Sequence, residues 1–248
     1  MKWDPCLYDN KHSFVAEYGN ELLEFVSFNK EQRVIDIGCG TGSLTEKLSK
    51  RCGYVLGIDG STEMIIKAQK QYPDIDFEVM DALEISYSHE WDIVFSNAVF
   101  HWIPNHDLLL SKIYNALKPT GKLVCEFGAY GNVKTIERGF SAVLKEKGYT
   151  YRSKFNFTTV EEFGALLTKN GFVIEKIYDY DRPTRLQDGE KGLNNWAKQF
   201  FNNELEKFSM EEQDYLLDKL QSKVKNTLWS GQEWIADYRR LRVIAHII

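Results

Sequence analysis

The segment that most constrains the fold is the loop from Asp36 to Gly42, which reads DIGCGTG. It follows a short apolar run from Arg33 to Ile37, which is typical of a buried strand, and it precedes a helical pattern. Glycines at alternate positions permit positive φ angles and let a ligand approach the backbone closely. In an open parallel sheet, ligands bind outside the carboxyl ends of the strands. The loop therefore predicts an α/β fold with a ligand site beside it.

Strand and helix patterns alternate from about residue 12 to residue 180, which favours β-α-β units and a largely parallel sheet. Two S/T-x-x-E sequences, Ser43 to Glu46 and Thr159 to Glu162, predict capping boxes, and Gly53 and Gly171 predict the ends of those helices. Strands are expected at 33–37, 54–58, 75–80, 91–95, 122–127 and 172–180, and helices at 61–71, 133–146 and 159–170. The fold class is a Rossmann-like sheet of seven mostly parallel strands with helices on both faces.

The pattern changes after residue 181, where polar helical segments replace the alternation. Helices are expected at 194–206 and 209–228, and a final strand at 241–247. The simplest topology pairs that strand with the one at 172–180, which makes the helices an insertion before the last strand. We therefore expect one domain over 1–248, with an N-terminal segment (1–28), a core (29–181), a helical insertion (182–236) and a final strand (237–248).

Composition narrows the classes of partner. The net charge of -5 and the pI of about 5.6 argue against nucleic acid and favour a small-molecule substrate. No apolar run approaches the roughly 18 residues that span a bilayer, and the first residues lack a signal-peptide pattern, so no membrane is expected. The four cysteines are Cys6, Cys39, Cys52 and Cys125. Their spacing is not that of metal ligands, so we expect free thiols in the cytoplasm and no metal.

The glycine spacing distinguishes two cofactor classes. A dinucleotide site requires the motif G-x-G-x-x-G or G-x-G-x-x-A, and here the last position of that motif is Ser43. The actual spacing is G-x-G-x-G with Asp36 two residues ahead, which resembles motif I of class I S-adenosylmethionine-dependent methyltransferases. The resemblance implies S-adenosylmethionine as cofactor, with Asp36 near its methionyl ammonium. It also implies that the loop backbone packs along the cofactor at Gly38, Cys39, Gly40 and Gly42.

The resemblance continues at the next strand ends. Asp59 matches the family acid that accepts both ribose hydroxyls, with Gly60 after it, and Met64 matches a position that packs against adenine. Asp81 and Ala82 match the pair beside the adenine amino group, and the segment from Asn97 matches the wall of the methionyl arm. Asp59 and Asp81 could instead be turn residues, and Met64 could belong to the core.

The substrate side carries weaker signals. Residues 97–106 resemble the small-molecule branch that includes trans-aconitate methyltransferases, in which the place of His101 is often Gln. His101 is either a general base, since histidine titrates near neutral pH, or a residue that packs the loop. Trp102 lines the cofactor pocket or belongs to the core. The N-terminal segment resembles the family's lid, so substrate contacts are expected from Tyr8, His12 and Phe14, and from Trp196 in the insertion. The alternatives are an amphipathic N-terminal helix that covers one face of the sheet and a packing role for Trp196.

Together these features predict an enzyme that methylates a small molecule at oxygen or nitrogen, with a carboxylate among the candidate acceptors. Methyl transfer from a sulfonium is an in-line displacement that alignment and exclusion of water accelerate, so no metal is needed. The alternatives are an NAD(P)-dependent oxidoreductase and a non-catalytic cofactor-binding protein of the same fold. The expected assembly is a monomer or a homodimer.

Overall fold

The computed structural model describes residues 19–248, which form two compact units. The described part of unit 1 comprises residues 19–129 with Thr158–Asp179 and Leu241–Ile248, and unit 2 comprises Tyr130–Phe157 and Tyr180–Arg240. The expected boundaries assigned residues 130–157 to the core, whereas the structure groups them with the inserted helices. The chain therefore leaves unit 1 and returns to it twice.

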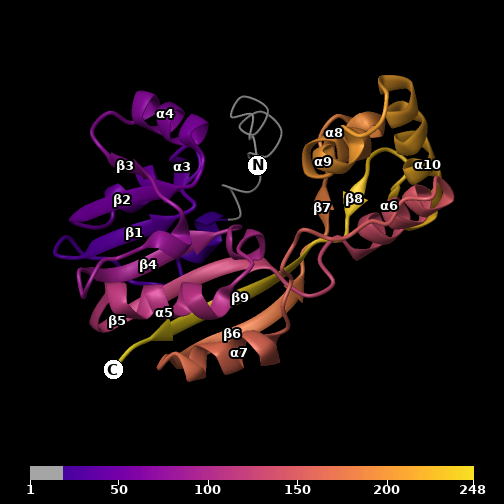
Figure 1. The fold of residues 1–248 in the computed structure, drawn as a ribbon. Coiled ribbons are helices and arrows are strands. Elements are labelled where there is room, and N and C mark those ends of the chain that lie inside the picture. The colour runs from indigo at the N-terminus through magenta and orange to yellow at the C-terminus, as the bar shows by residue number, and fades with distance from the viewer. Residues whose placement is uncertain (1–18) are drawn as a thin grey trace. The chain divides into compact units, whose positions relative to one another are not determined.

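A seven-stranded sheet with the order β3-β2-β1-β4-β5-β9-β6 forms the centre of unit 1 (Figure 1). The pairs β1–β2, β1–β4, β2–β3 and β4–β5 are parallel. The N–H group of Ile247 donates to the carbonyl of Gly121, and Arg242 pairs with Glu126, so residue numbers fall along β9 as they rise along β5 and the two strands are antiparallel. This confirms the expected fold class and places the final strand beside β6. The strands are β1 Arg33–Ile37, β2 Tyr54–Asp59, β3 Asp76–Val79, β4 Trp91–Asn97, β5 Leu117–Gly128, β6 Val173–Asp181 and β9 Arg239–His246.

Helices cover both faces of this sheet because strand side chains alternate between faces. Val34, Phe95 and Val124 pack against α3 (Ser43–Ser49) and residues 19–23, which are also helical. Ile35 and Cys125 point to the opposite face, which α5 (His106–Ala116) and α7 (Val160–Lys169) cover (Figure 1). The other helical elements of unit 1 are α4 Thr62–Gln71, η1 Ala82–Glu84 and η2 Phe100–Trp102.

Three local expectations for unit 1 are wrong. Ser43 does not cap α3, because the cap position is Gly42, whose φ of 87° is left-handed and which makes no side-chain cap bond. That helix ends at Ser49 rather than at Gly53. The fifth strand, expected at 122–127, begins earlier, at Leu117, in a stretch where the register with β4 shifts and Thr120 has a φ of 64°. The capping box of Thr159 and Glu162 is confirmed.

Unit 2 is mostly helical. A methyl group added at Gly139 of α6 would come within 2.6 Å of Val224 in α10, so glycine permits close approach of these helices. Ser209 and Glu212 form a capping box at the start of α10, while the helix expected at 194–206 breaks at Phe201. A two-stranded β7–β8 sheet was not predicted. The elements are α6 Lys134–Glu146, β7 Thr184–Arg185, η3 Gly189–Lys191, α8 Gly192–Phe200, α9 Asn202–Leu205, α10 Met210–Leu228 and β8 Ile235–Ala236.

None of the helices described over residues 19–248 combines the length and the apolar character that a bilayer crossing requires.

Candidate functional site

The glycine loop connects β1 to α3 at the carboxyl edge of the sheet. Gly38, Gly40 and Gly42 have φ angles of 72°, 55° and 87°, which L side chains rarely adopt. A Cβ at Gly38 would lie 2.2 Å from the Cγ2 atom of Val99, so this glycine is also required by space. The N–H groups of Gly38 and Cys39 both donate to the carbonyl of Ile58, at 2.8 and 3.0 Å. These bonds hold the loop against the end of β2.

Asp36 lies in β1 directly before this loop and is 2% exposed. One carboxyl oxygen accepts a hydrogen bond from the hydroxyl of Thr45 in α3 at 2.7 Å. Burial raises the pKa of Asp36 to about 7, the Thr45 bond opposes that rise, and the nearby charge of Asp59 adds to it. A carboxyl group with this pKa is about half protonated at neutral pH unless a positive charge approaches it. A cation beside Asp36 would therefore be strongly favoured.

Asp59 ends β2 and faces the same loop. Its two carboxyl oxygens accept from the N–H groups of Gly40 at 3.0 Å and Ser61 at 2.8 Å. Burial raises the pKa of Asp59, and the two backbone bonds work against that rise. Each carboxylate oxygen has two lone pairs, so each can accept one further bond. A Cβ at the exposed neighbour Gly60 would meet nothing within 4 Å, so Asp59 stands next to open space.

The residues predicted to lie near adenine differ in their burial. Met64 is 3% exposed, and its N–H donates to the hydroxyl of Ser61, which caps α4. Asp81 is exposed and caps η1 by accepting from the N–H of Leu83 at 2.9 Å, and Ala82 is the first residue of that helix. The hydrogen bond to Leu83 thus supports the interpretation of Asp81 as a turn residue. Its role beside adenine stays a prediction.

Asn97 ends β4, where the backbone is strained. The next residue, Ala98, has a φ of 62°, and its N–H donates to the carbonyl of Glu126 at 2.7 Å. Non-glycine residues in this conformation are uncommon and occur often at functional sites. A Cβ at Gly19 would lie 3.1 Å from the Asn97 amide nitrogen and 2.3 Å from Leu44. The described N-terminal residues therefore begin against the end of β4.

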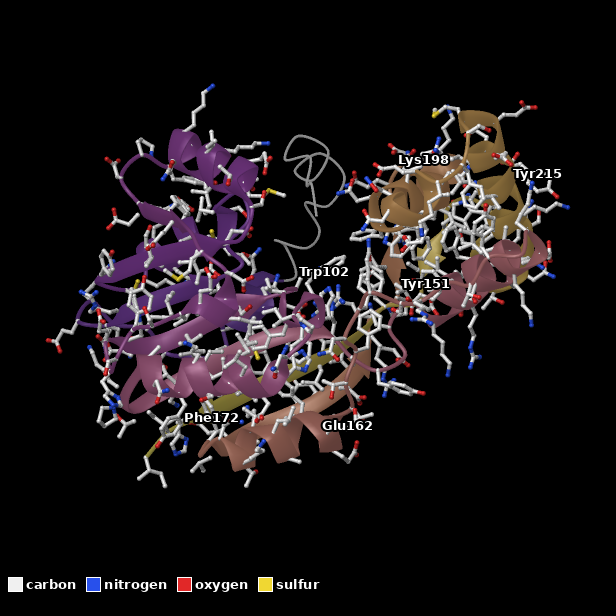
Figure 2. The ribbon with its side chains drawn as sticks, viewed as in Figure 1. Trp102, Tyr151, Glu162, Phe172, Lys198 and Tyr215 are labelled. Carbon is white, nitrogen blue, oxygen red and sulfur yellow. The ribbon has the colours of Figure 1, made fainter. Side chains whose placement is uncertain are left out.

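His101 lies in η2 and is 7% exposed. The N–H of Gly128, at the end of β5, donates to Nδ1 of His101 at 3.1 Å, so the ring proton resides on Nε2. The lone pair of the neutral ring is thus already engaged. This geometry favours the packing interpretation of His101 over the general-base interpretation. The neighbouring Trp102 ring (Figure 2) lies 5.2 Å from the His101 ring and is half-buried.

The predicted substrate residues fall in different parts of the chain. Trp196, in unit 2, is 3% exposed, and its indole N–H donates to the Tyr238 hydroxyl at 2.7 Å. Its ring packs 4.6 Å from Phe200 and 5.4 Å from Phe201. The remaining three, Tyr8, His12 and Phe14, lie outside the described residues.

Sequence reasoning missed several polar partners. Thr45 was not singled out, although it lies on the helix that follows the loop. A buried ion pair joins Arg242 in β9 to Glu126 in β5 at 2.5 Å, and Glu21 lies 3.3 Å from the same guanidinium. The sequence does contain a signal for this ion pair. Both charged residues interrupt otherwise apolar strand runs, and buried charges are normally paired.

Comparisons with known proteins agree with this geometry. Residues 35–125 match the family described as methyltransferase domain. An uncharacterized methyltransferase of Schizosaccharomyces pombe is 29% identical over 98% of this chain and 97% of its own length. A trans-aconitate 2-methyltransferase of Methylobacterium nodulans is 32% identical over 79% of this chain and 78% of its own. The chain belongs to the class I S-adenosylmethionine-dependent methyltransferases. The oxidoreductase alternative is therefore wrong.

A solved structure shares the fold of this methyltransferase. It is a phosphoethanolamine N-methyltransferase 2 of Haemonchus contortus in complex with phosphomonomethylethanolamine and S-adenosylhomocysteine, 23% identical, with a TM-score of 0.58 over 92% of this chain and 52% of that chain. S-adenosylmethionine is the cofactor of the present chain. The donor set fits it, since a buried acid suits an ammonium and a bidentate acid beside open space suits a diol.

Proposed function

We propose that this methyltransferase transfers the methyl group to a carboxylate oxygen of a small organic acid and so forms a methyl ester. The similarity to a trans-aconitate 2-methyltransferase over 78% of that relative suggests the acceptor class. The observation that carries the choice is the engaged Nδ1 of His101. A carboxylate is already ionised at neutral pH and needs no base, whereas an ammonium or a hydroxyl acceptor must lose a proton.

The proposed cofactor contacts follow from the same geometry. Asp36 would hold the methionyl ammonium, which stabilises the ionised form of this buried acid, and Asp59 would accept both ribose hydroxyls. The loop backbone at Gly38, Cys39, Gly40 and Gly42 would pack along the cofactor. The proposed adenine neighbours are Met64, Asp81 and Ala82, and the proposed methionyl neighbours are Asn97 and Trp102.

When bound, S-adenosylmethionine supplies a methyl group on a sulfonium. The leaving group is a neutral thioether, which needs no proton from an acid. The chain's own contribution is then to align the acceptor oxygen with that methyl and to exclude water. His101 would act as a positioning residue, because its bond to Gly128 ties η2 to the end of β5.

The test is methyl transfer from labelled S-adenosylmethionine to a panel of small acceptors: trans-aconitate, other carboxylic acids, amines and alcohols. We expect label in a product that mild base hydrolyses to methanol, as an ester requires. Label in a base-stable amine or ether product would contradict the carboxylate proposal. The Asp59→Ala variant, expected to have lost most of its cofactor affinity, serves as the low-activity control.

We also propose that the working protein is a cytoplasmic monomer or homodimer that binds no nucleic acid and that the chain is a single methyltransferase domain. The net charge of -5 and the free, buried state of Cys39, Cys52 and Cys125 support the first part. Light scattering of the purified protein tests the assembly.

A further inference from the structure

The hydroxyl of Thr45 contacts the buried acid that precedes the glycine loop. Thr45 lies in the first turn of α3 and is 0% exposed. Its Oγ1 atom donates to Oδ2 of Asp36 at 2.7 Å, and no other group of residues 19–248 donates to that carboxyl. The contact therefore engages one carboxyl oxygen and leaves Oδ1 for a ligand.

This hydrogen bond favours the charged form of a carboxyl group that burial disfavours. Burial raises the pKa of Asp36 to about 7, and the Thr45 hydroxyl acts in the opposite direction. A hydroxyl that donates to a carboxylate stabilises its ionised form. Without it, Asp36 would be mostly protonated at neutral pH, and a neutral carboxyl binds an ammonium less well than a carboxylate does.

The charged and titratable groups around Asp36 do not replace this contact. Asp59 on β2 raises the pKa of Asp36, and burial beside these two acids raises the pKa of the Cys39 thiol as well. The residues that pair with Asp36 in β2 and β4 carry no charge. The charged side chains of the helices on this face have other partners: Glu46 with Lys50, Lys47 with Asn20, and Glu21 with Arg242.

We propose that Thr45 is a positioning residue for the methyl donor, because its hydroxyl keeps Asp36 ionised and directs Oδ1 toward the methionyl ammonium. The inference rests on the proposed contact between Asp36 and that ammonium, and it holds for any methyl acceptor. It makes cofactor binding depend on pH, since only ionised Asp36 forms the ion pair. The contribution of Asp36 to affinity should rise with pH through about 7 and level off above it.

Calorimetric titration of the full-length protein with S-adenosylhomocysteine at pH 6 and pH 8.5 tests this role. Thr45→Val keeps the size of the side chain and removes the hydroxyl. We expect the rise in affinity to move upward by about one pH unit, as loss of a hydrogen bond to a charged group predicts. The variant should then bind about tenfold more weakly than wild type at pH 6 and within about twofold at pH 8.5. The ligand's own ammonium titrates identically with both proteins, so it cancels in this ratio.

Two controls separate the hydroxyl from the rest of the side chain. Thr45→Ser keeps the hydroxyl and should bind within about twofold of wild type at both pH values. Thr168→Val removes an exposed hydroxyl from α7, on the other face of the sheet, and should also bind as wild type does. Thr45→Ala provides a second variant without the hydroxyl should valine not fold.

The outcomes separate this inference from the proposed cofactor contact. Equal loss of affinity at both pH values in Thr45→Val indicates a purely structural role and would overturn the inference, as would wild-type affinity at pH 6. Asp36→Asn tests the contact itself. Unchanged affinity of that variant at pH 8.5 removes the ammonium contact and the inference with it. A loss there, combined with a pH-independent ratio for Thr45→Val, keeps the contact and removes the role of Thr45.

Discussion

The buried carboxyl of Asp36 makes the stability of the cofactor-free protein depend on pH, and Asp36→Asn isolates that effect. The pKa rises from 3.8 to about 7 on folding, mainly because burial disfavours the charged form. One pKa unit corresponds to about 1.4 kcal/mol, so ionised Asp36 lowers the free energy of unfolding by about 4 kcal/mol. Asparagine keeps an oxygen that accepts the Thr45 bond and never ionises.

The direction of the pH dependence follows from the pKa of Asp36 in the unfolded and in the folded protein. Because the folded-state pKa is the higher one, the contribution of Asp36 to stability is fully present below about pH 4, declines as pH rises, and is lost above about pH 7. The advantage of Asp36→Asn over wild type should therefore grow by about 3 kcal/mol between pH 5 and pH 8, since about two pKa units of that window lie below the folded-state value.

Urea unfolding of the cofactor-free protein at pH 5 and pH 8 measures this difference. Asp74→Asn is the matched control, because Asp74 is exposed in the turn before β3, and its substitution should leave the pH dependence as in wild type. The reasoning fails if Asp36→Asn is no more stable than wild type at pH 8, or if its advantage is the same at both pH values.

Three further variants test the site, and a fourth, Gly164→Ala, is a control outside it. Asp59→Asn places an amide NH₂ against a backbone N–H, so it should weaken S-adenosylhomocysteine binding at least about tenfold by calorimetry and cost about 1–3 kcal/mol in urea unfolding; wild-type affinity would contradict the ribose role. Gly38→Ala should destabilise by about 1–3 kcal/mol, because φ is 72° and Val99 lies 2.2 Å from the new methyl. Gly164→Ala in α7, with neighbours at 3.7 Å, should stabilise by about 0.5–1 kcal/mol in the same assay. His101→Asn should lower kcat without changing the shape of its pH profile, whereas loss of an ionisation from that profile would restore the general-base role.

The strands of the sheet were predictable because each is a short apolar run that can be recognised from neighbouring residues in the sequence. The failures occur where distant contacts decide the structure. Ser43 has the sequence of a cap, but the left-handed Gly42 before it takes the cap position. Residues 130–157 form the helix expected in them, yet no local pattern states that α6 packs on α10 rather than on the sheet.

The candidate site divides in the same way. The location of Asp36 and Asp59 beside the glycine loop was predictable, because strand ends converge at one edge of a parallel sheet. The state of Asp36 was not, since its pKa depends on burial and on Thr45. His101 illustrates the limit best. Its position pointed to the site, while the partner that occupies its lone pair comes from Gly128, 27 residues further along the chain.

The place of β9 between β5 and β6 has a consequence for synthesis on the ribosome. This strand is made after every other strand of the sheet, and also after both stretches of unit 2. Until it emerges, β5 and β6 each present an unpaired edge, and such edges are templates for aggregation. The nascent chain therefore exposes the edge of β5 once residue 128 has been made and that of β6 once residue 181 has been made, and it depends on β9 to pair with both.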